Sequence, residues 1–186
     1  GNNISYSIYD KTVANPTTVN VKEAEDLWYQ SECKAIIGFG GGSSIDCAKA
    51  VGARIAKPKQ SLSKMKGILK VHKKLPLLVA IPTTAGTGSE ATQFTIINDT
   101  EHNVKMLLKG SVLIPDLAIV DPQFTLSAPK KITASTGMDA FTHAAEAYTS
   151  KKATKMSDTF ALSAIRRIVK YLPAAYQDGT NVEARE

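Results

Sequence analysis

The sequence has few cysteines and no long apolar run, and these two shortages limit the class of protein. Its 186 residues include two cysteines, Cys33 and Cys47, which cannot form a disulfide framework and lack the spacing of a zinc site. The longest apolar runs, residues 35–39 and 75–82, are too short to cross a bilayer, and the polar start GNNISYSIYD has no signal-peptide core. We therefore expect a soluble, cytoplasmic protein without a membrane partner.

Acidic residues are also missing over one long stretch. No Asp or Glu lies between Asp46 and Glu90, whereas nine Lys and Arg residues do, in a chain whose formal net charge is +6. The basic charge is therefore local. Residues 57–74 contain no aromatic side chain and no nucleic-acid-binding motif, so we expect an exposed surface segment and no nucleic-acid partner. A nucleic-acid-binding module is the alternative interpretation of this run.

Short apolar runs alternate with helical patterns in the first half of the chain. The pattern predicts strands at 17–21, 34–39 and 77–81, and helices at 22–31, at 43–56 and, on the surface, within 58–74. A strand, a helix and a further strand in this order are typical of βαβ units. We therefore expect an α/β fold with a parallel sheet.

The pattern changes after residue 90. Two strand-like runs, residues 91–97 and 104–108, flank the polar turn NDTEHN and predict a β-hairpin. Residues 116–120 predict one more strand.

From residue 130 the pattern is wholly helical. It predicts helices over 130–149 and 157–171, the second of which we expect to end near Pro173. The shift in composition near Pro129 predicts two domains, residues 1–128 and residues 129–186. Because two helices leave an apolar face without partners, we expect the chain to continue in the intact protein.

The segment GFGGGSSIDCAKA, residues 38–50, places a glycine turn between a strand and a helix. Glycines let backbone N–H groups approach a phosphate closely, and a helix N-terminus adds partial positive charge. The spacing matches neither GxGxxG nor the P-loop, but the physics favours a pyrophosphate cradle. The alternative is an ordinary turn in which Ser43 caps the helix and Asp46 is its capping-box partner.

The segment IPTTAGTGSEAT, residues 81–92, carries five hydroxyl groups and two glycines directly after a predicted strand. Ligands bind at the carboxyl ends of the strands in open α/β sheets. The hydroxyls are therefore candidates for holding phosphate and ribose oxygens. The alternative is a polar connecting loop.

The segment TGMDAFTHAAEAY, residues 136–148, places Asp139 and His143 four residues apart on a predicted helix. This spacing puts a carboxylate and an imidazole on one face, within reach of a single ion. Such ligands suit Fe²⁺, Zn²⁺ or Mn²⁺, and the absence of nearby thiolates argues against a structural zinc site. The alternative is a surface ion pair.

In order and wording, these motifs resemble the iron-containing (group III) alcohol dehydrogenase family, part of the superfamily of glycerol dehydrogenase and dehydroquinate synthase. The resemblance extends from Asn15 to about Ser150, through NPT, GGGSSIDCAKA, IPTTAGTGSE and TGMDAFTHAAEAY. It implies a Rossmann-like parallel-sheet nucleotide-binding domain with a β-hairpin, followed by the start of an all-helical metal-binding domain. The chain resembles the central part of a longer polypeptide.

The resemblance also implies roles for individual residues. The positions that match contacts to NAD or NADP are Asn15, Gly41, Gly42, Ser43, Thr83, Thr84, Thr87, Thr92 and Lys105. Asp46 is implied either to support the glycine turn or to lie beside the nicotinamide. Asp139 and His143 match the first two ligands of Fe²⁺ or Zn²⁺, and the family's two further histidine ligands lie beyond this chain. His72 and His102 match neither, and we expect both to be exposed.

The implied activity is that of an oxidoreductase that interconverts a small primary alcohol or diol with its aldehyde. The resemblance implies a homo-oligomer, a dimer or larger. We nominate no side chain of this chain as a general base. One alternative is a zinc-dependent polyol dehydrogenase of the glycerol type. Another is a non-catalytic fragment that binds cofactor or assembles with its own copies.

Overall fold

The computed structural model describes residues 4–68 and 70–186. Contacts divide the chain into two compact units, Gly1–Ile81 with Ser89–Ile119, and Pro82–Gly88 with Val120–Glu186. We refer to them as the α/β unit and the helical unit. Among the described residues, no helix combines the length and the apolar content needed to cross a membrane.

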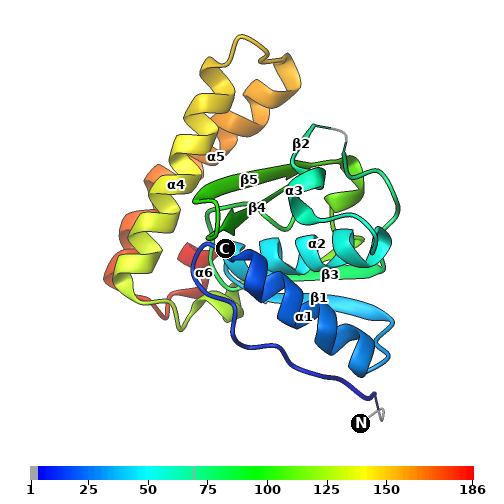
Figure 1. Ribbon diagram of the computed structural model, residues 1–186. Coiled ribbons are helices and arrows are strands. Elements are labelled where there is room, and N and C mark those ends of the chain that lie inside the picture. The colour runs from blue at the N-terminus through cyan, green and yellow to red at the C-terminus, as the bar shows by residue number, and fades with distance from the viewer. Residues whose placement is uncertain (1–3, 69) are drawn as a thin grey trace. The chain divides into compact units, whose positions relative to one another are not determined.

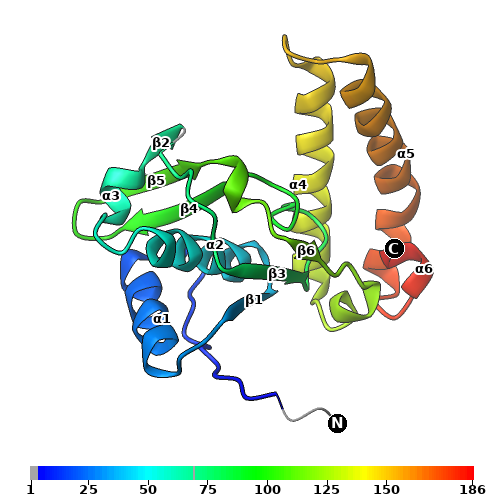
Figure 2. The same ribbon diagram turned by 90° about the vertical axis from the view of Figure 1, so that its right-hand side faces the viewer.

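The α/β unit contains two three-stranded sheets (Figures 1 and 2). The first has the order β1-β3-β6, formed by Ala35–Gly40, Leu77–Pro82 and Leu117–Ala118. Strands β3 and β6 are parallel, as the βαβ rhythm predicts, although β6 is shorter than the predicted strand over 116–120. The second has the order β2-β5-β4, formed by Gly67–Ile68, Val104–Lys109 and Phe94–Asp99. Strands β4 and β5 are antiparallel, which confirms the predicted hairpin.

Helix α2 (Gly42–Ala56) contacts both sheets of this unit, packing against β1 and β4. Figure 2 shows it between β3 and β4. Ile45, Ala50 and Ala53 are completely buried, and small side chains allow the sheets to approach the helix from two sides. A Cβ at Gly52 would lie 2.8 Å from Leu75 Cδ2, so the absence of a side chain there permits close packing. Because α2 is strongly buried, the residues at its N-terminus are held in place within the α/β unit.

Helix α1 spans Thr18–Gln30, so the strand predicted over residues 17–21 is wrong. Thr17 caps the helix in a capping box with Asn20, and this local hydrogen bonding outweighs the β-branched composition. Val21 is 1% exposed in the core. The Arg54 guanidinium of α2 binds both Glu25 carboxylate oxygens, at 3.0 and 3.1 Å, and this bidentate pair fixes α1 against α2.

The basic segment contains a short helix, α3 (Leu62–Met65), and the short strand β2, which the sequence pattern did not predict. Leu62 and Met65 are buried in the core cluster of the α/β unit. Most of the lysines in this segment are exposed, which confirms the predicted exposed surface. The two buried side chains anchor the segment, and most of its lysines remain in solvent.

The helical unit consists mainly of α4 (Lys130–Thr149) and α5 (Lys155–Gln177), followed by α6 (Val182–Arg185). The bounds of α4 match the prediction. A Cβ at Gly137 of α4 would lie 2.8 Å from Leu172 Cδ2, so this glycine allows the two helices to pack closely. Arg185 donates to Thr133 Oγ1 at 3.1 Å and to the Gly179 carbonyl at 2.7 Å, which secures the end of the chain to α4.

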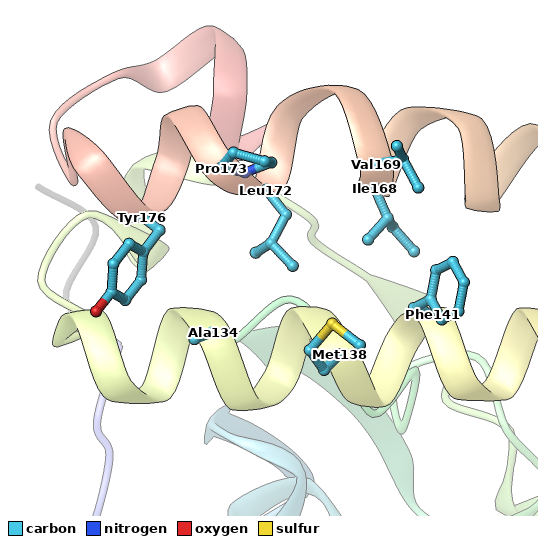
Figure 3. Close-up of a pocket in the computed structure, with 8 residues that line it drawn as sticks. All are labelled: Ala134, Met138, Phe141, Ile168, Val169, Leu172, Pro173 and Tyr176. Carbon is cyan, nitrogen blue, oxygen red and sulfur yellow. The ribbon is translucent and has the colours of Figure 1, made fainter.

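Helix α5 continues past Pro173, so the predicted end of this helix is wrong. Proline removes one backbone donor, but packing of the following turn offsets this loss, since Ala175 is 5% exposed. Side chains of α4 and α5 line an apolar cavity of about 550 Å³. Figure 3 shows Met138 and Phe141 on α4 facing Ile168 and Leu172 on α5 across this cavity.

Candidate functional site

The glycine turn joins β1 to α2, and a side chain would be crowded at two glycine positions that precede the helix. Gly40 has φ +141°, and a Cβ there would lie 2.5 Å from Ser44 Oγ. A Cβ at Gly38 would lie 3.1 Å from Ala48 Cβ, so glycine lets β1 approach the helix. Gly41 is the N-cap of α2, without a side-chain hydrogen bond. Ser43 lies inside the first turn, so the alternative interpretation, in which Ser43 caps the helix with Asp46 as its capping-box partner, is wrong.

The first turn of α2 suits an anionic ligand. The early N–H groups of a helix have no partner within the helix, and the helix dipole concentrates positive charge at the same end. No acidic residue lies in the first turn of this 15-residue helix. The chemistry of the turn therefore fits a pyrophosphate group.

Asn15 lies beside the glycine turn, in the left-handed conformation, with φ +57°. Its N–H donates to Ser43 Oγ at 3.1 Å, and its carbonyl accepts from Asn98 Nδ2 at 3.3 Å. Asn98 lies directly across the hairpin from Lys105. The structure therefore groups three of the predicted cofactor residues, Asn15, Ser43 and Lys105, around Asn98.

Sequence reasoning missed Asn98, because the pattern placed it in the polar turn NDTEHN, whereas β4 continues to Asp99. Its Oδ1 atom is buried and has no hydrogen-bond partner within the part of the chain that the structure describes. A buried polar atom without a partner favours a ligand or water nearby. The register of the hairpin was the one signal that could have placed Asn98 opposite Lys105.

Asp46 lies on the side of α2 that faces strand β4. Its carboxylate accepts from the Ile96 N–H at 3.1 Å, and its carbonyl accepts from Thr95 Oγ1 at 2.7 Å. Burial raises the pKa of the Asp46 carboxyl, and the Ile96 hydrogen bond and the nearby Lys49 oppose that rise. These contacts attach the hairpin to the helix that begins at the glycine turn.

Lys49 is a second residue that sequence reasoning missed. It is 0% exposed, and its ammonium donates to the Thr92 carbonyl at 2.6 Å, to Thr92 Oγ1 at 3.0 Å and to the Phe94 carbonyl at 3.0 Å. Burial lowers the pKa of Lys49 to about 8, although the negative charges of Asp46 and Glu90 act in the opposite direction. The Thr92 hydroxyl donates in turn to the Ser89 carbonyl at 3.4 Å. Both the hydroxyl and the carbonyl of Thr92 therefore form hydrogen bonds within the α/β unit.

The earlier part of the threonine loop, residues 82–88, belongs to the helical unit. Thr83, Thr84 and Thr87 are partly exposed there. A Cβ at Gly86 would lie 2.7 Å from Thr136 Cβ and still closer to the Thr136 carbonyl oxygen. The loop backbone can therefore lie against α4 only because residue 86 is glycine. Thr136 precedes Asp139 by about one helical turn.

Asp139 and His143 project from α4 as the sequence spacing predicts. His143 Nε2 lies 3.6 Å from Asp139 Oδ1, and the two side chains are 54% and 43% exposed. One carboxylate and one imidazole are borderline to hard donors, which fit Fe²⁺ or Zn²⁺. Two ligands alone hold such an ion weakly.

The other histidines are exposed, as predicted. Among the described residues, one group brings three metal-type ligands together, namely Asp99, Glu101 and His102 on the turn of the hairpin. Asp99 accepts hydrogen bonds from the N–H groups of Glu101 and His102, both at 3.2 Å. It also contacts the His102 ring at 2.8 Å, which raises the pKa of His102. The hydrogen bonds of this cluster stabilise the hairpin turn.

Comparison with known proteins places the chain in a family. Residues 1–122 match the model of the iron-containing alcohol dehydrogenases, and residues 133–186 match the C-terminal model of the Fe-containing alcohol dehydrogenase family. The chain belongs to the iron-containing alcohol dehydrogenase family, and its α/β fold, predicted from the sequence, is confirmed.

Individual relatives agree with this assignment. The NAD-dependent methanol dehydrogenase of Bacillus methanolicus is 41% identical over 183 residues, which cover 98% of this chain and 48% of the relative. The 1,3-propanediol dehydrogenase of Klebsiella pneumoniae is 39% identical over 183 residues, covering 98% and 47%. A crystal structure of a 1,3-propanediol oxidoreductase superposes with a TM-score of 0.94 and 38% identity, covering 97% of this chain and 47% of that one. The chain thus spans about half the length of these relatives.

Proposed function

We propose that the full-length protein is a metal-assisted, NAD-linked alcohol dehydrogenase that interconverts a small primary alcohol or diol with its aldehyde. The observation that carries this proposal is the glycine turn at the start of α2. The chain belongs to the family, and it also has Asp139 and His143 one helical turn apart on α4. Relatives named as methanol and 1,3-propanediol dehydrogenases support the substrate class. A small alcohol or aldehyde is therefore the expected partner.

The proposed cofactor-binding residues are those that the family resemblance implies. In the α/β unit they are Asn15, Gly41, Gly42, Ser43, Asp46, Thr92 and Lys105, and in the helical unit Thr83, Thr84 and Thr87. The open helix start supports binding of the pyrophosphate, and the unpaired Asn98 Oδ1 supports a polar ligand beside Asn15. We infer NAD as the cofactor from the relative named as NAD-dependent, with NADP as the alternative.

The proposed metal ligands are Asp139 and His143, and the proposed ion is Fe²⁺, with Zn²⁺ as the alternative. When bound, the nicotinamide cofactor supplies hydride chemistry, and the metal supplies Lewis acidity toward the alcohol oxygen. His143 would bind a metal ion through a neutral imidazole nitrogen. The alternative, a zinc-dependent polyol dehydrogenase, would use the same two ligands. Metal analysis of the full-length protein and activity assays with small alcohols and with polyols would distinguish the two.

The domain division proposed here is a nucleotide-binding α/β domain over residues 1–128 and the start of a helical metal-binding domain over 129–186. A homo-oligomer and a cytoplasmic location are proposed on the family resemblance. The alternative is a non-catalytic fragment that binds cofactor or assembles with its own copies.

Metal removal and one substitution test the proposal in the full-length protein. The wild type should hold one Fe²⁺ or Zn²⁺ per subunit and reduce NAD in the presence of a small alcohol, and a chelator should abolish turnover. His143→Ala should lose metal and turnover but keep NAD affinity within about twofold, because the imidazole is a proposed metal ligand and is not among the proposed cofactor-binding residues. Elemental analysis and calorimetric NAD titration measure both quantities. If His143→Ala keeps its metal and its activity, Asp139 and His143 form a surface pair and the assignment fails.

A further inference from the structure

We propose that Asn98 is a positioning residue for Asn15, because its amide and its backbone hold residues 15–17 on the edge of strand β4. This inference rests on the proposed function, in which Asn15 contacts the cofactor. Asn98 Nδ2 donates to the Asn15 carbonyl at 3.3 Å, and the Asn98 N–H donates to the Pro16 carbonyl at 2.8 Å. Thr17 forms an isolated parallel β-bridge with the same residue. Three successive residues are therefore attached to one residue of the hairpin.

The backbone of Asn15 adopts a conformation that needs such support. Its φ of +57° lies in the left-handed region, which few residues other than glycine adopt. The proline that follows disfavours the right-handed helical region and favours extended backbone at Asn15. Two hydrogen bonds oppose this preference, one from the Asn15 N–H to Ser43 Oγ at 3.1 Å and one from Asn98 Nδ2 to the Asn15 carbonyl. Asn98 therefore stabilises the left-handed conformation from the side of the hairpin.

The side chain of Asn15 remains available to a ligand. Asn15 is exposed, and its hydrogen bonds within the described part of the chain involve only its backbone. A fixed backbone that carries a free amide is preorganised for a polar ligand, because less conformational freedom is lost on binding. Lys105, another proposed cofactor residue, lies directly opposite Asn98, so the two side chains share one face of the hairpin. Asn98 thereby connects two proposed cofactor contacts.

The amide of Asn98 has a cost for the stability of β4. Its Oδ1 atom is buried and has no hydrogen-bond partner among the described residues. An unpaired buried oxygen is destabilising, and valine or threonine is the more favourable choice for a strand. The contact that an amide adds over such residues is the Nδ2 hydrogen bond to the Asn15 carbonyl. The amide therefore indicates a role beyond the stability of the strand.

The test compares Asn98→Ala with Thr100→Ala in the full-length protein. Both variants replace a polar hairpin side chain with alanine, but Thr100 is exposed and lies outside the proposed site. Asn98→Ala should raise the Kd and the KM for NAD by about fivefold or more, because the unsupported Asn15 backbone relaxes toward extended conformations, while kcat at saturating NAD falls by less than about threefold. The Tm should change by less than about 5 °C, because the backbone hydrogen bond to Pro16 remains. Thr100→Ala should match the wild type in all four quantities.

A double-mutant cycle separates positioning from direct contact with NAD. Asn15→Gly removes the Asn15 side chain and should itself raise the Kd for NAD, and glycine adopts positive φ without strain. If Asn98 acts through Asn15, adding Asn98→Ala to Asn15→Gly should raise the Kd by less than about a further twofold. A further increase of about fivefold on this background would overturn the positioning role, because Asn98 would then act independently of Asn15.

Hydrogen exchange without any nucleotide provides a readout that does not depend on activity. In Asn98→Ala the Asn15 amide should exchange about tenfold faster, because its hydrogen bond to Ser43 Oγ requires the supported conformation, while amides of α1 and α2 keep their protection. If Asn98→Ala does not fold, Asn98→Asp replaces it. An ionised carboxylate keeps the shape of the amide but cannot donate to the Asn15 carbonyl, so exchange at Asn15 should shift in the same direction.

A folded Asn98 variant with wild-type NAD affinity and wild-type exchange at Asn15 would refute the positioning role. A general loss of protection with unchanged NAD affinity per folded molecule would also refute it, by showing that Asn98 only stabilises the hairpin. Both outcomes leave the proposed function intact, because the wild type still binds NAD. A wild type that binds no NAD would instead refute the proposed function, and this inference would fail with it.

Discussion

At the scale of single residues, the glycines of the turn matter through the atoms they lack. Gly40 and Gly38 make room for Ser44 and Ala48, and Gly41 and Gly42 form the start of α2 without side chains. A phosphate group can approach a helix start only as closely as the local side chains allow. The proposed cofactor contact therefore depends on the absence of bulk as much as on hydrogen-bond donors.

We predict that Gly42→Val weakens NAD binding in the full-length protein. Gly42 is the first residue of α2 and does not have positive φ, so valine can adopt its backbone conformation, and the expected effect is steric. The Kd for NAD should rise by at least about tenfold, or about 1.4 kcal/mol, while metal content stays at the wild-type level. Calorimetric titration and elemental analysis measure these quantities.

Gly42→Ala is the matched control for this substitution. One methyl group should give an intermediate Kd, because the obstruction grows with side-chain size. Affinity within about twofold of the wild type in Gly42→Val would show that no phosphate lies against this turn.

At the scale of elements, the threonine loop depends on close packing at both of its ends. In the helical unit Gly86 lies against Thr136 of α4, and in the α/β unit Thr92 is held by Lys49 of α2. Neither contact involves the hydroxyl groups of Thr83, Thr84 or Thr87. The side chains proposed to bind cofactor are therefore carried by a backbone that other residues fix.

We predict that Gly86→Ala displaces the loop from α4. The new methyl group would meet Thr136 backbone atoms, which cannot move without disturbing the helix one turn before Asp139. Overpacking of this kind costs about 1–3 kcal/mol, so the Tm should fall and the Kd for NAD should rise. Differential scanning calorimetry and nucleotide titration provide the two measurements.

Gly88→Asn is the control in the same loop. Gly88 has φ +63° and open space around its Cβ position, and asparagine tolerates this conformation better than most residues. Its Tm should remain close to the wild-type value. Equal effects of the two substitutions would show that any change in the loop is harmful and that the Gly86–Thr136 contact has no special role.

At the scale of the whole molecule, charge and apolar surface are unevenly distributed. The basic segment, residues 57–74, carries seven lysines and no acidic residue, which exceeds the net charge of +6, while Ile37 and Leu77 of the first sheet are 63% and 54% exposed. In the helical unit, Met138 and Val169 beside the cavity between α4 and α5 are 53% and 62% exposed (Figure 3). Apolar surface of this extent is typical of faces that other protein segments cover.

We predict that the basic segment makes no contribution to catalysis. Replacing Lys64, Lys66 and Lys70 with Gln lowers the net charge of +6 by three, yet kcat and the KM for NAD should stay within about twofold of wild type. All three lysines are exposed, whereas Leu62 and Met65 anchor the segment in the core. Steady-state kinetics test the prediction. A loss of activity, or salt-dependent DNA binding by the wild type, would contradict it.

The sequence by itself determined the elements whose signals are local. The run before the glycine turn, helix α2, the hairpin and helix α4 were all predicted, because hydrophobic periodicity and turn residues act over a few positions. The spacing of Asp139 and His143 likewise determined that they share a helix face. Their roles as metal ligands, and those of the cofactor residues, remain predictions.

Only the tertiary structure decided which element formed where local signals conflict or where partners lie far apart in sequence. A cap at Thr17 and burial of Val21 make residues 18–21 helical despite their β-branched composition. Packing around Ala175 carries α5 past Pro173. Lys49 meets its acceptors 43 and 45 residues later in the chain, and Asn98 meets Asn15 across 83 residues. A lysine on a helix and an asparagine on a strand carry no local mark of such partners, because the folded chain alone brings the groups within hydrogen-bond distance.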